Sequence, residues 1–171
     1  MGEKSLSEVG TVSFGERLAS SQAFTALFRE GMALVEETAS YLDGEGRTEA
    51  KALQRHAALS YATESMRLTT RLMQLASWLL LHRAVNEGEM SLVQARKEKA
   101  KVRVWSDEHT DEESRRMLPE RLRELIDRSL EVQGRVRRLD STIHSSGEAP
   151  VNNPVERQMG LLRAAFDSNR A

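Results

Sequence analysis

YATESMRLTTRLMQLASWLLLHRAVNEGEM, residues 61–90, is the stretch that decides the fold, because its apolar residues recur with helical spacing. One line of side chains follows alternating steps of three and four residues: Ala58, Tyr61, Ser65, Leu68, Leu72, Leu75, Leu79 and His82. A second line lies about 100° further round the same helix: Leu59, Ala62, Met66, Thr69, Met73, Ala76, Leu80 and Ala84. Together the two lines form an apolar arc too broad for one neighbour, so we expect this helix to pack against two others.

The third side of this helix is polar at first and apolar at its end. In chain order it carries Arg67, Arg71, Gln74, Trp78, Leu81 and Val85. Tryptophan and arginine are favoured at the centres of protein interfaces, so these six residues are candidate partner-binding residues. The alternative is that the connector at residues 91–117 folds back over the apolar end. If that end forms a homodimer seam instead, Trp78→Glu is expected to give a monomer that keeps its helicity.

An amphipathic helix is expected before the long one, over residues 20–43, with a serine at its start as N-cap. Its interior glycine, Gly31, costs helix propensity, which favours either a close backbone approach or a local kink there. The sequence DGEG, residues 43–46, predicts a turn. The long helix, expected over residues 48–87, then runs back along the first.

A third core helix is expected over residues 118–145, after a charged connector at residues 88–117. Its seam has a strict four-three spacing: Leu118, Leu122, Leu125, Ser129, Val132, Val136, Leu139 and Ile143. The sequence therefore predicts an all-α, antiparallel three-helix bundle over residues 20–145, with one long central helix.

Both ends of the chain differ from this bundle. Residues 1–19 lack periodicity and are expected to form a loose lead-in, whereas residues 146–171 form a flexible tail that begins with a linker rich in glycine and proline. The tail carries one short amphipathic segment, with these apolar residues: Val155, Met159, Leu162 and Phe166. It is too short to be stable alone, so it either docks on the bundle or folds on a partner.

Composition narrows the class of protein. The 171 residues suit one domain, and 25 basic against 26 acidic side chains leave a formal charge of −1. There is no cysteine, no secretory signal and no apolar run of the length that a membrane span needs, so we expect a cytoplasmic protein. Two basic clusters, residues 96–103 and 135–138, leave association with nucleic acid as an alternative function.

Catalytic and metal-binding patterns are absent from the sequence. The four histidines are His56, His82, His109 and His144. None lies three or four residues from another, and no nucleotide-binding glycine motif or nucleophile elbow occurs. We therefore expect a protein that is not an enzyme and that binds neither metal nor cofactor.

Three blocks of the sequence carry a resemblance to a known family. They are SFGERLASSQAF, FREGMALVEETASYLDGEGR and ALSYATESMRLTTRLMQLASWLLLHRAVNEGEM, between about residues 13 and 90. They resemble the alphaproteobacterial family named for the regulator of CtrA degradation, long catalogued as a domain of unknown function.

The resemblance implies a three-helix bundle, a tendency to form homodimers and a role as an adaptor. In that role the protein helps to deliver cell-cycle regulators to the ClpXP protease, together with a response-regulator adaptor and a cyclic-di-GMP effector. The resemblance assigns no partner-binding residues beyond Met90. It agrees with the residue patterns in pointing to an interaction protein.

Overall fold

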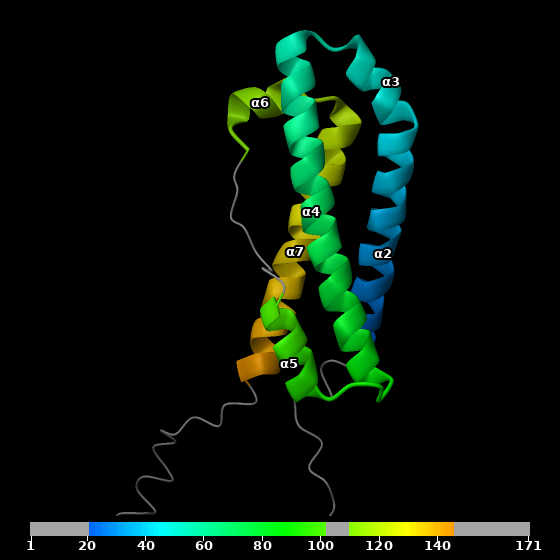
Figure 1. Ribbon diagram of the computed structural model, residues 1–171, viewed down its shortest axis with the longest axis vertical. Helices are drawn as coiled ribbons and strands as arrows, with labels where there is room; N and C mark the ends of the chain where they lie inside the picture. Colours follow the sequence, from blue (N-terminus) through cyan, green and yellow to red (C-terminus); the bar gives the residue numbers. More distant parts are fainter. Residues whose placement is uncertain (1–20, 102–109, 146–171) are drawn as a thin grey trace, which may run out of the picture.

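Six helices form the regular structure of the part of the chain that the computed structural model describes, residues 21–101 and 110–145 (Figure 1). They are α2 (Gln22–Asp43), α3 (Glu45–Ala52), α4 (Arg55–Asn86), α5 (Leu92–Lys101), α6 (Glu112–Arg116) and α7 (Glu120–Ser145). Within these residues no strand occurs, which confirms the predicted all-α class. The predicted lead-in and tail, with Val155, Met159, Leu162 and Phe166, lie outside the described residues.

Helix α2 begins at a serine cap, as predicted. The hydroxyl of Ser21 accepts a hydrogen bond from the backbone N–H of Phe24 at 3.3 Å, which satisfies one of the free donors of the first turn. Gly31 lies where α2 crosses α4, because a Cβ atom there would stand 2.5 Å from Cδ1 of Leu79. The side chain of Leu79 therefore fills the space beside Gly31, and the nearest atoms belong to side chains, so the expected close approach of a second backbone is not what this glycine accommodates.

The long helix predicted over residues 48–87 is in fact two helices, α3 and α4. Leu53 (ψ 147°) and Gln54 (ψ 156°) are both extended, which interrupts the helix. The break places α3 against both α2 and α4, and the side chain of Leu53 packs on the core. Neither glycine nor proline stands at this point, so local sequence gives no sign of the break.

The direction of α7 also differs from the antiparallel bundle that the sequence predicts. The side-chain pairs that join α4 to α7 are Arg71 with Ser129 and Trp78 with Asp140. Residue numbers rise together in these pairs, so α7 runs parallel to α4, and α2 is antiparallel to both. The chain returns to the start of α4 before α7 begins, and α6 lies at that end of the bundle (Figure 1).

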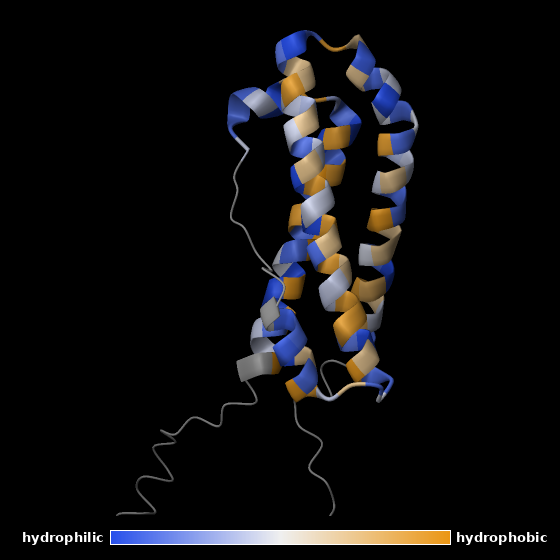
Figure 2. Cartoon of the chain, in the orientation of Figure 1, coloured by the Kyte–Doolittle hydropathy of each residue, from blue (hydrophilic) through white to orange (hydrophobic). Residues whose placement is uncertain are grey.

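The core lies between α2, α4 and α7, each of which contacts the other two. Its most buried aliphatic side chains are Leu34, Leu68, Leu75, Leu79, Leu122, Leu125, Ile126, Val132, Val136 and Ile143. Apolar residues recur along the whole of α4 (Figure 2). Among the helices that the structure describes, none is long and apolar enough to cross a membrane.

Candidate docking surface on helix α4

The apolar end of the third side of α4 lies mostly inside the protein, which corrects the expectation of an exposed binding surface. Trp78 is 1% exposed, and its indole N–H donates a hydrogen bond of 2.8 Å to Asp140. Lys99 of α5 forms an ion pair with the other oxygen of this carboxylate. Helix α5 packs on α4 with Ala95 buried, so the alternative of a connector that folds back is the one observed.

The neighbours of Trp78 explain why a large ring with a polar N–H group is stable inside the protein. Its ring lies 6.1 Å from the ring of Phe24 and is stacked on His82 at 4.0 Å. His82 is fully buried, and its Nδ1 lies 3.0 Å from the carbonyl oxygen of Trp78. Trp78 therefore joins α2, α4 and α7, and Trp78→Glu would bury a charge rather than split a dimer. Leu81 and Val85 are only partly exposed.

The polar part of the same side lies between α4 and α7. Arg71 is 9% exposed, and its guanidinium donates a hydrogen bond of 3.0 Å to the hydroxyl of Ser129. Arg67 donates to the buried carboxylate of Glu64 at 2.7 Å. The second oxygen of Glu64 accepts a hydrogen bond from Thr110, which ties the end of the connector to α4. Contacts within α4, to α7 and to Thr110 therefore hold Arg67, Arg71 and Glu64 in place.

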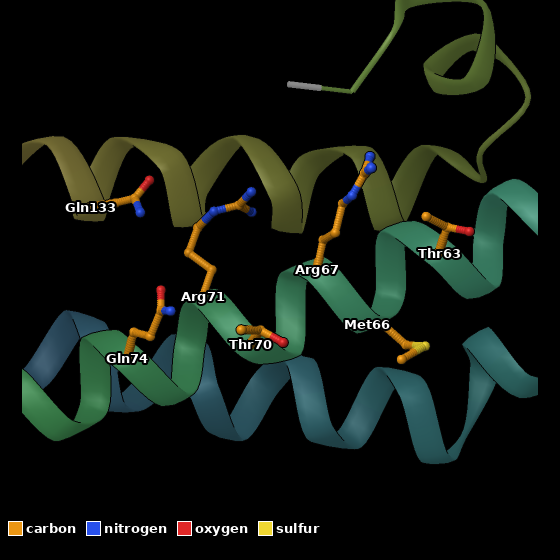
Figure 3. A pocket seen from close by; sticks show the side chains of 7 residues that line it. All are labelled: Thr63, Met66, Arg67, Thr70, Arg71, Gln74 and Gln133. Atoms are coloured by element: carbon orange, nitrogen blue, oxygen red, sulfur yellow. The ribbon is translucent and has the colours of Figure 1, made fainter. Parts of the chain in front are cut away.

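An open pocket of about 330 Å³ lies beside these arginines (Figure 3). Its lining consists of Thr63, Met66, Arg67, Thr70, Arg71, Gln74 and Gln133. Three of the six candidate partner-binding residues, Arg67, Arg71 and Gln74, are thus brought together here. The lining contains two guanidinium groups, two amides and two hydroxyls but no carboxylate, so its chemistry suits an acidic group. Sequence spacing alone did not place Gln133 here, because it comes from α7.

The second apolar line of α4 is exposed, although the sequence predicts that it packs inside the bundle. The exposed fractions are 65% for Leu59, 72% for Met66, 65% for Met73 and 49% for Leu80. We call the whole line the outward stripe: Leu59, Ala62, Met66, Thr69, Met73, Ala76, Leu80 and Ala84. None of its members is charged, in a chain in which 30% of residues are charged. Single exposed apolar residues are ordinary, whereas a line of them along one helix is a candidate interaction surface.

The hydroxyl groups along the outward stripe do not make it hydrophilic. The hydroxyl of Thr69 donates to the backbone carbonyl of Ser65 at 2.8 Å, and that of Ser77 donates to the carbonyl of Met73 at 2.8 Å. Each hydroxyl is therefore satisfied by its own helix, as serine and threonine within helices commonly are. The stripe can be buried without leaving these donors unpaired.

Ion pairs between α2 and α7 involve the second basic cluster and its neighbours. Arg135 pairs with Glu30, whereas Arg121 and Arg128 both pair with Glu37. The hydrogen bond from Arg128 is the largest cause that lowers the pKa of the Glu37 carboxyl, and the charges of both arginines act in the same direction. These positive charges are partly neutralised within the bundle.

A second buried polar contact lies where α2, α3 and α4 meet. The hydroxyl of Tyr41 donates a hydrogen bond of 2.6 Å to Glu49. Burial, followed by this contact, raises the pKa of Tyr41 far above its ordinary value. A Cβ atom on Gly46 would stand 2.6 Å from the hydroxyl of Tyr61 and 2.8 Å from the carbonyl oxygen of Tyr41. The two tyrosines therefore pack closely against Gly46, and this packing requires glycine at position 46. Within the described ranges no cluster of three metal-binding side chains occurs.

Comparison with known proteins identifies relatives of this chain. The sequence pattern of the family described as "Protein of unknown function (DUF1465)" matches residues 15–166. A solved structure, RcdA from Caulobacter crescentus CB15, is 49% identical in sequence with a TM-score of 0.61. The alignment covers 75% of this chain and 96% of that one. No protein with a curated description matches.

The family match extends the resemblance well beyond Met90, because it continues through α7 to residue 166. A protein with this identity and coverage shares its fold and ancestry with RcdA, which confirms the family that the sequence blocks indicate. The chain belongs to the DUF1465 family and is an RcdA-like protein.

Proposed function

We propose that this protein is a non-enzymatic adaptor or scaffold in regulated proteolysis. The observation that carries the proposal is its relationship to RcdA, at 49% identity over almost the whole of that chain. In the proposed role, it is a cytoplasmic homodimer that helps to deliver cell-cycle regulators to the ClpXP protease. The protein selects its cargo proteins by binding them and catalyses no reaction on them.

The pocket beside Arg67 and Arg71 is the proposed docking site for a protein partner. Arginine forms paired hydrogen bonds with carboxylates, and amide and hydroxyl groups at the rim can accept or donate further bonds. The proposed ligand is therefore an acidic side chain or a terminal carboxylate on an exposed segment of a partner. Met66 adds an adaptable apolar contact at the edge of the pocket.

The tail at residues 146–171 is proposed as a second contact, through Val155, Met159, Leu162 and Phe166. Two weak contacts on one chain raise the overall affinity, because the second forms at a high effective concentration. Co-purification of partners with the full chain and with a chain that ends at residue 145 tests this part. Identical partner sets for the two chains would contradict a role for the tail.

Protein half-lives test the adaptor role. They are measured by quantitative mass spectrometry after translation is blocked. Cells that lack the protein are expected to stabilise a small set of regulators, and the same set should be stabilised when ClpP is inactive. Unchanged half-lives would contradict the proposal. If loss of the adaptor stabilises regulators that the loss of ClpP activity does not, delivery to ClpXP is contradicted but the adaptor role is not.

Variants of the pocket separate docking from folding. Gln74→Glu with Thr70→Glu adds negative charge at the pocket, which should repel an acidic segment and stabilise the same regulators. Ala26→Glu with Ala39→Glu adds the same two charges at exposed positions of α2 and serves as the matched control. Equal turnover in the two variants would exclude the pocket as the docking site.

A further inference from the structure

Another open pocket, of about 360 Å³, lies where the start of α2 meets the end of α4 (Figure 1). We call it the entry pocket, and its lining consists of Phe24, Thr25, Phe28, Arg29, Arg83, Asn86 and Glu87. Phe24 and Phe28 form its apolar part, with the centres of their rings 6.3 Å apart. A pocket of this size, with an apolar floor and a few polar groups at its rim, is typical of sites that bind a large apolar group.

Phe28 is the part of the pocket that gains most from an occupant. It packs on the core but is only partly buried, whereas Phe24 is 3% exposed. The guanidinium carbon of Arg83 lies 5.1 Å from the centre of the Phe28 ring, and Nε of Arg83 donates a hydrogen bond of 2.8 Å to Glu87. Contacts between a cation and a ring become stronger when water is removed from them. An apolar side chain placed over Phe28 would therefore stabilise groups that are already in position.

The usual apolar contact at the start of a helix is not available to α2. The entry of a helix is often fixed by a residue just before the N-cap that packs on the fourth residue of the helix. Ser21 is the N-cap here, and serine and threonine occupy the two positions, at Ser20 and Thr25. The nearest large apolar residues of the preceding chain are Leu18 and Phe14. They are four residues apart, so a single helical turn presents both on one side.

We propose that residues 13–20 dock in the entry pocket and fill it with the side chains of Phe14 and Leu18. For these eight residues alone, the proposal replaces the loose lead-in that the sequence predicts. An apolar cavity of about 150 Å³ holds one benzene ring. The entry pocket, at about 360 Å³, therefore has room for about two large apolar side chains. The docked segment connects the first turns of α2 to the last turns of α4, and the adaptor role does not depend on it.

The length of the segment suits this site. The pocket begins within one turn of Ser21, because its first lining residue is Phe24. Leu18 and Phe14 precede Ser21 by three and seven residues, so an extended chain spans at most about 11 Å and about 25 Å. Arg29, at the far rim, lies about 12 Å along the helix from Ser21 at a rise of about 1.5 Å per residue. Both apolar residues therefore reach the pocket if the chain turns back at Ser21, whose backbone is extended (ψ 160°) and leaves the helical path.

The charges of the segment complement the rim of the pocket. Glu16 and Arg17 stand between the two apolar residues of the segment. At the rim, Arg83 is paired with Glu87, which leaves the positive charge of the exposed Arg29. Glu16 supplies the opposite charge, and opposite charges across a contact fix its orientation. In the proposed orientation Glu16 therefore faces Arg29.

Hydrogen exchange of the native full chain, followed by mass spectrometry, tests whether residues 13–20 are docked. Their backbone amides are expected to exchange at least about tenfold more slowly than those of an unstructured peptide of the same sequence. Phe14→Ser with Leu18→Ser should remove this protection and speed exchange in the first turns of α2. Leu6→Ser with Val9→Ser makes the same kind of change outside the segment and should alter neither. Unprotected amides at residues 13–20 of the native chain would overturn the proposal.

A substitution that fills the pocket tests whether the segment docks at this place. Thr25 lines the pocket and is exposed, so Thr25→Trp puts a ring into the pocket and should release the segment, with the helical circular dichroism spectrum retained. Ala26→Trp adds the same ring at the next exposed position, outside the lining, and should leave the protection of residues 13–20 unchanged. Equal protection in the two variants would show that the entry pocket is not the docking site.

A charge exchange tests the orientation of the segment by the same measurement. Arg29→Glu should lower the protection of residues 13–20 by about two- to fivefold, as expected for the loss of an exposed ion pair. Adding Glu16→Arg to Arg29→Glu should restore most of the protection, because the pair forms again with its charges reversed. Absence of this recovery would overturn the orientation in which Glu16 faces Arg29.

Two other occupants of the entry pocket give different results, and either would overturn the proposal. If the tail fills the pocket, Leu162→Ser with Phe166→Ser speeds exchange around Phe28 and leaves residues 13–20 unaffected. If a partner protein fills it, residues 13–20 exchange freely in the native chain, and Thr25→Trp loses that partner in co-purification whereas Ala26→Trp retains it.

Discussion

Two sides of helix α4 differ in burial, and their comparison shows what burial depends on in this protein. The third side of the helix, which we call the inward side, contains groups that are costly to bury, among them Glu64, Arg71 and Trp78, yet each is close to fully buried. The outward stripe contains only aliphatic, methionine and hydroxyl side chains, yet Met66 and Met73 are mostly exposed. Polar groups are buried where Thr110, Lys99 of α5 or residues of α7 provide hydrogen-bond partners, as expected from the cost of an unsatisfied group.

Removal of the Trp78 ring should show the largest difference in stability between substitutions on the two sides of α4. Trp78→Ala is expected to lower the free energy of unfolding by about 3–5 kcal/mol, because a large cavity forms and Asp140 loses a donor. Met73→Ala, on the stripe, should change the stability of the folded monomer by at most about 0.5 kcal/mol. Urea unfolding at low protein concentration checks both, and similar losses would contradict the distinction between the sides.

The carboxylate of Asp140 shows whether the inward side depends on its polar partners. Asp140→Ala should cost about 2 kcal/mol, since Trp78 and Lys99 both lose their acceptor. Asp140→Asn keeps an acceptor for the indole and should retain part of that stability. Thermal unfolding followed by circular dichroism measures both variants. Equal stability of the alanine variant and the native protein would contradict a stabilising role for the Asp140 carboxylate.

Two glycines within helices provide a matched pair for the α2–α4 contact. Gly31→Ala should cost about 1–3 kcal/mol, because its Cβ would stand 2.5 Å from the buried side chain of Leu79. Gly134→Ala should instead stabilise the protein by up to about 1 kcal/mol, because only Arg138 lies within 4 Å of its Cβ and alanine favours the helix. Chemical unfolding of both variants checks the opposite signs.

The smallest expected effect concerns the ion pairs between α2 and α7. The lowered pKa of Glu37 means that its ionised form stabilises the folded state above the ordinary value of 4.5, and this stability is lost as pH falls through the lower folded value. Each exposed pair contributes about 0.2–1 kcal/mol, so Glu37→Gln should cost little at neutral pH and make the decline in stability below pH 4.5 shallower. An unchanged pH profile would contradict this contribution.

The parts of the fold that local chemistry determines could be predicted from the sequence. The helical class and the cap at Ser21 follow from spacing and from the properties of serine. The break at Leu53 and Gln54 could not be predicted, because no helix-breaking residue stands there. It depends on the packing of Leu53 and α3 against the rest of the bundle.

The direction of α7 and the fate of the third side of α4 depend on contacts between distant residues. Thr110 binds Glu64 and Lys99 binds Asp140, which returns the connector along the bundle and covers Trp78. Periodicity identifies three apolar or mixed sides of α4 but does not rank them by burial. Of the six candidate residues, the structure brings Arg67, Arg71 and Gln74 together at one pocket, where partner binding stays a prediction, and it buries Trp78, which the sequence placed on an exposed surface.

The central claim is that the inward side of α4 holds the bundle together, whereas the outward stripe does not contribute to the folding of the chain. The most direct test is the circular dichroism spectrum and the urea unfolding of Trp78→Glu and of Met73→Glu, measured side by side with the native protein. The account predicts that Trp78→Glu loses cooperative unfolding, because it buries a charge, whereas Met73→Glu keeps the helical spectrum and the unfolding midpoint of the native protein. A Trp78→Glu variant as stable as the native protein, or a Met73→Glu variant that is unfolded, would contradict it.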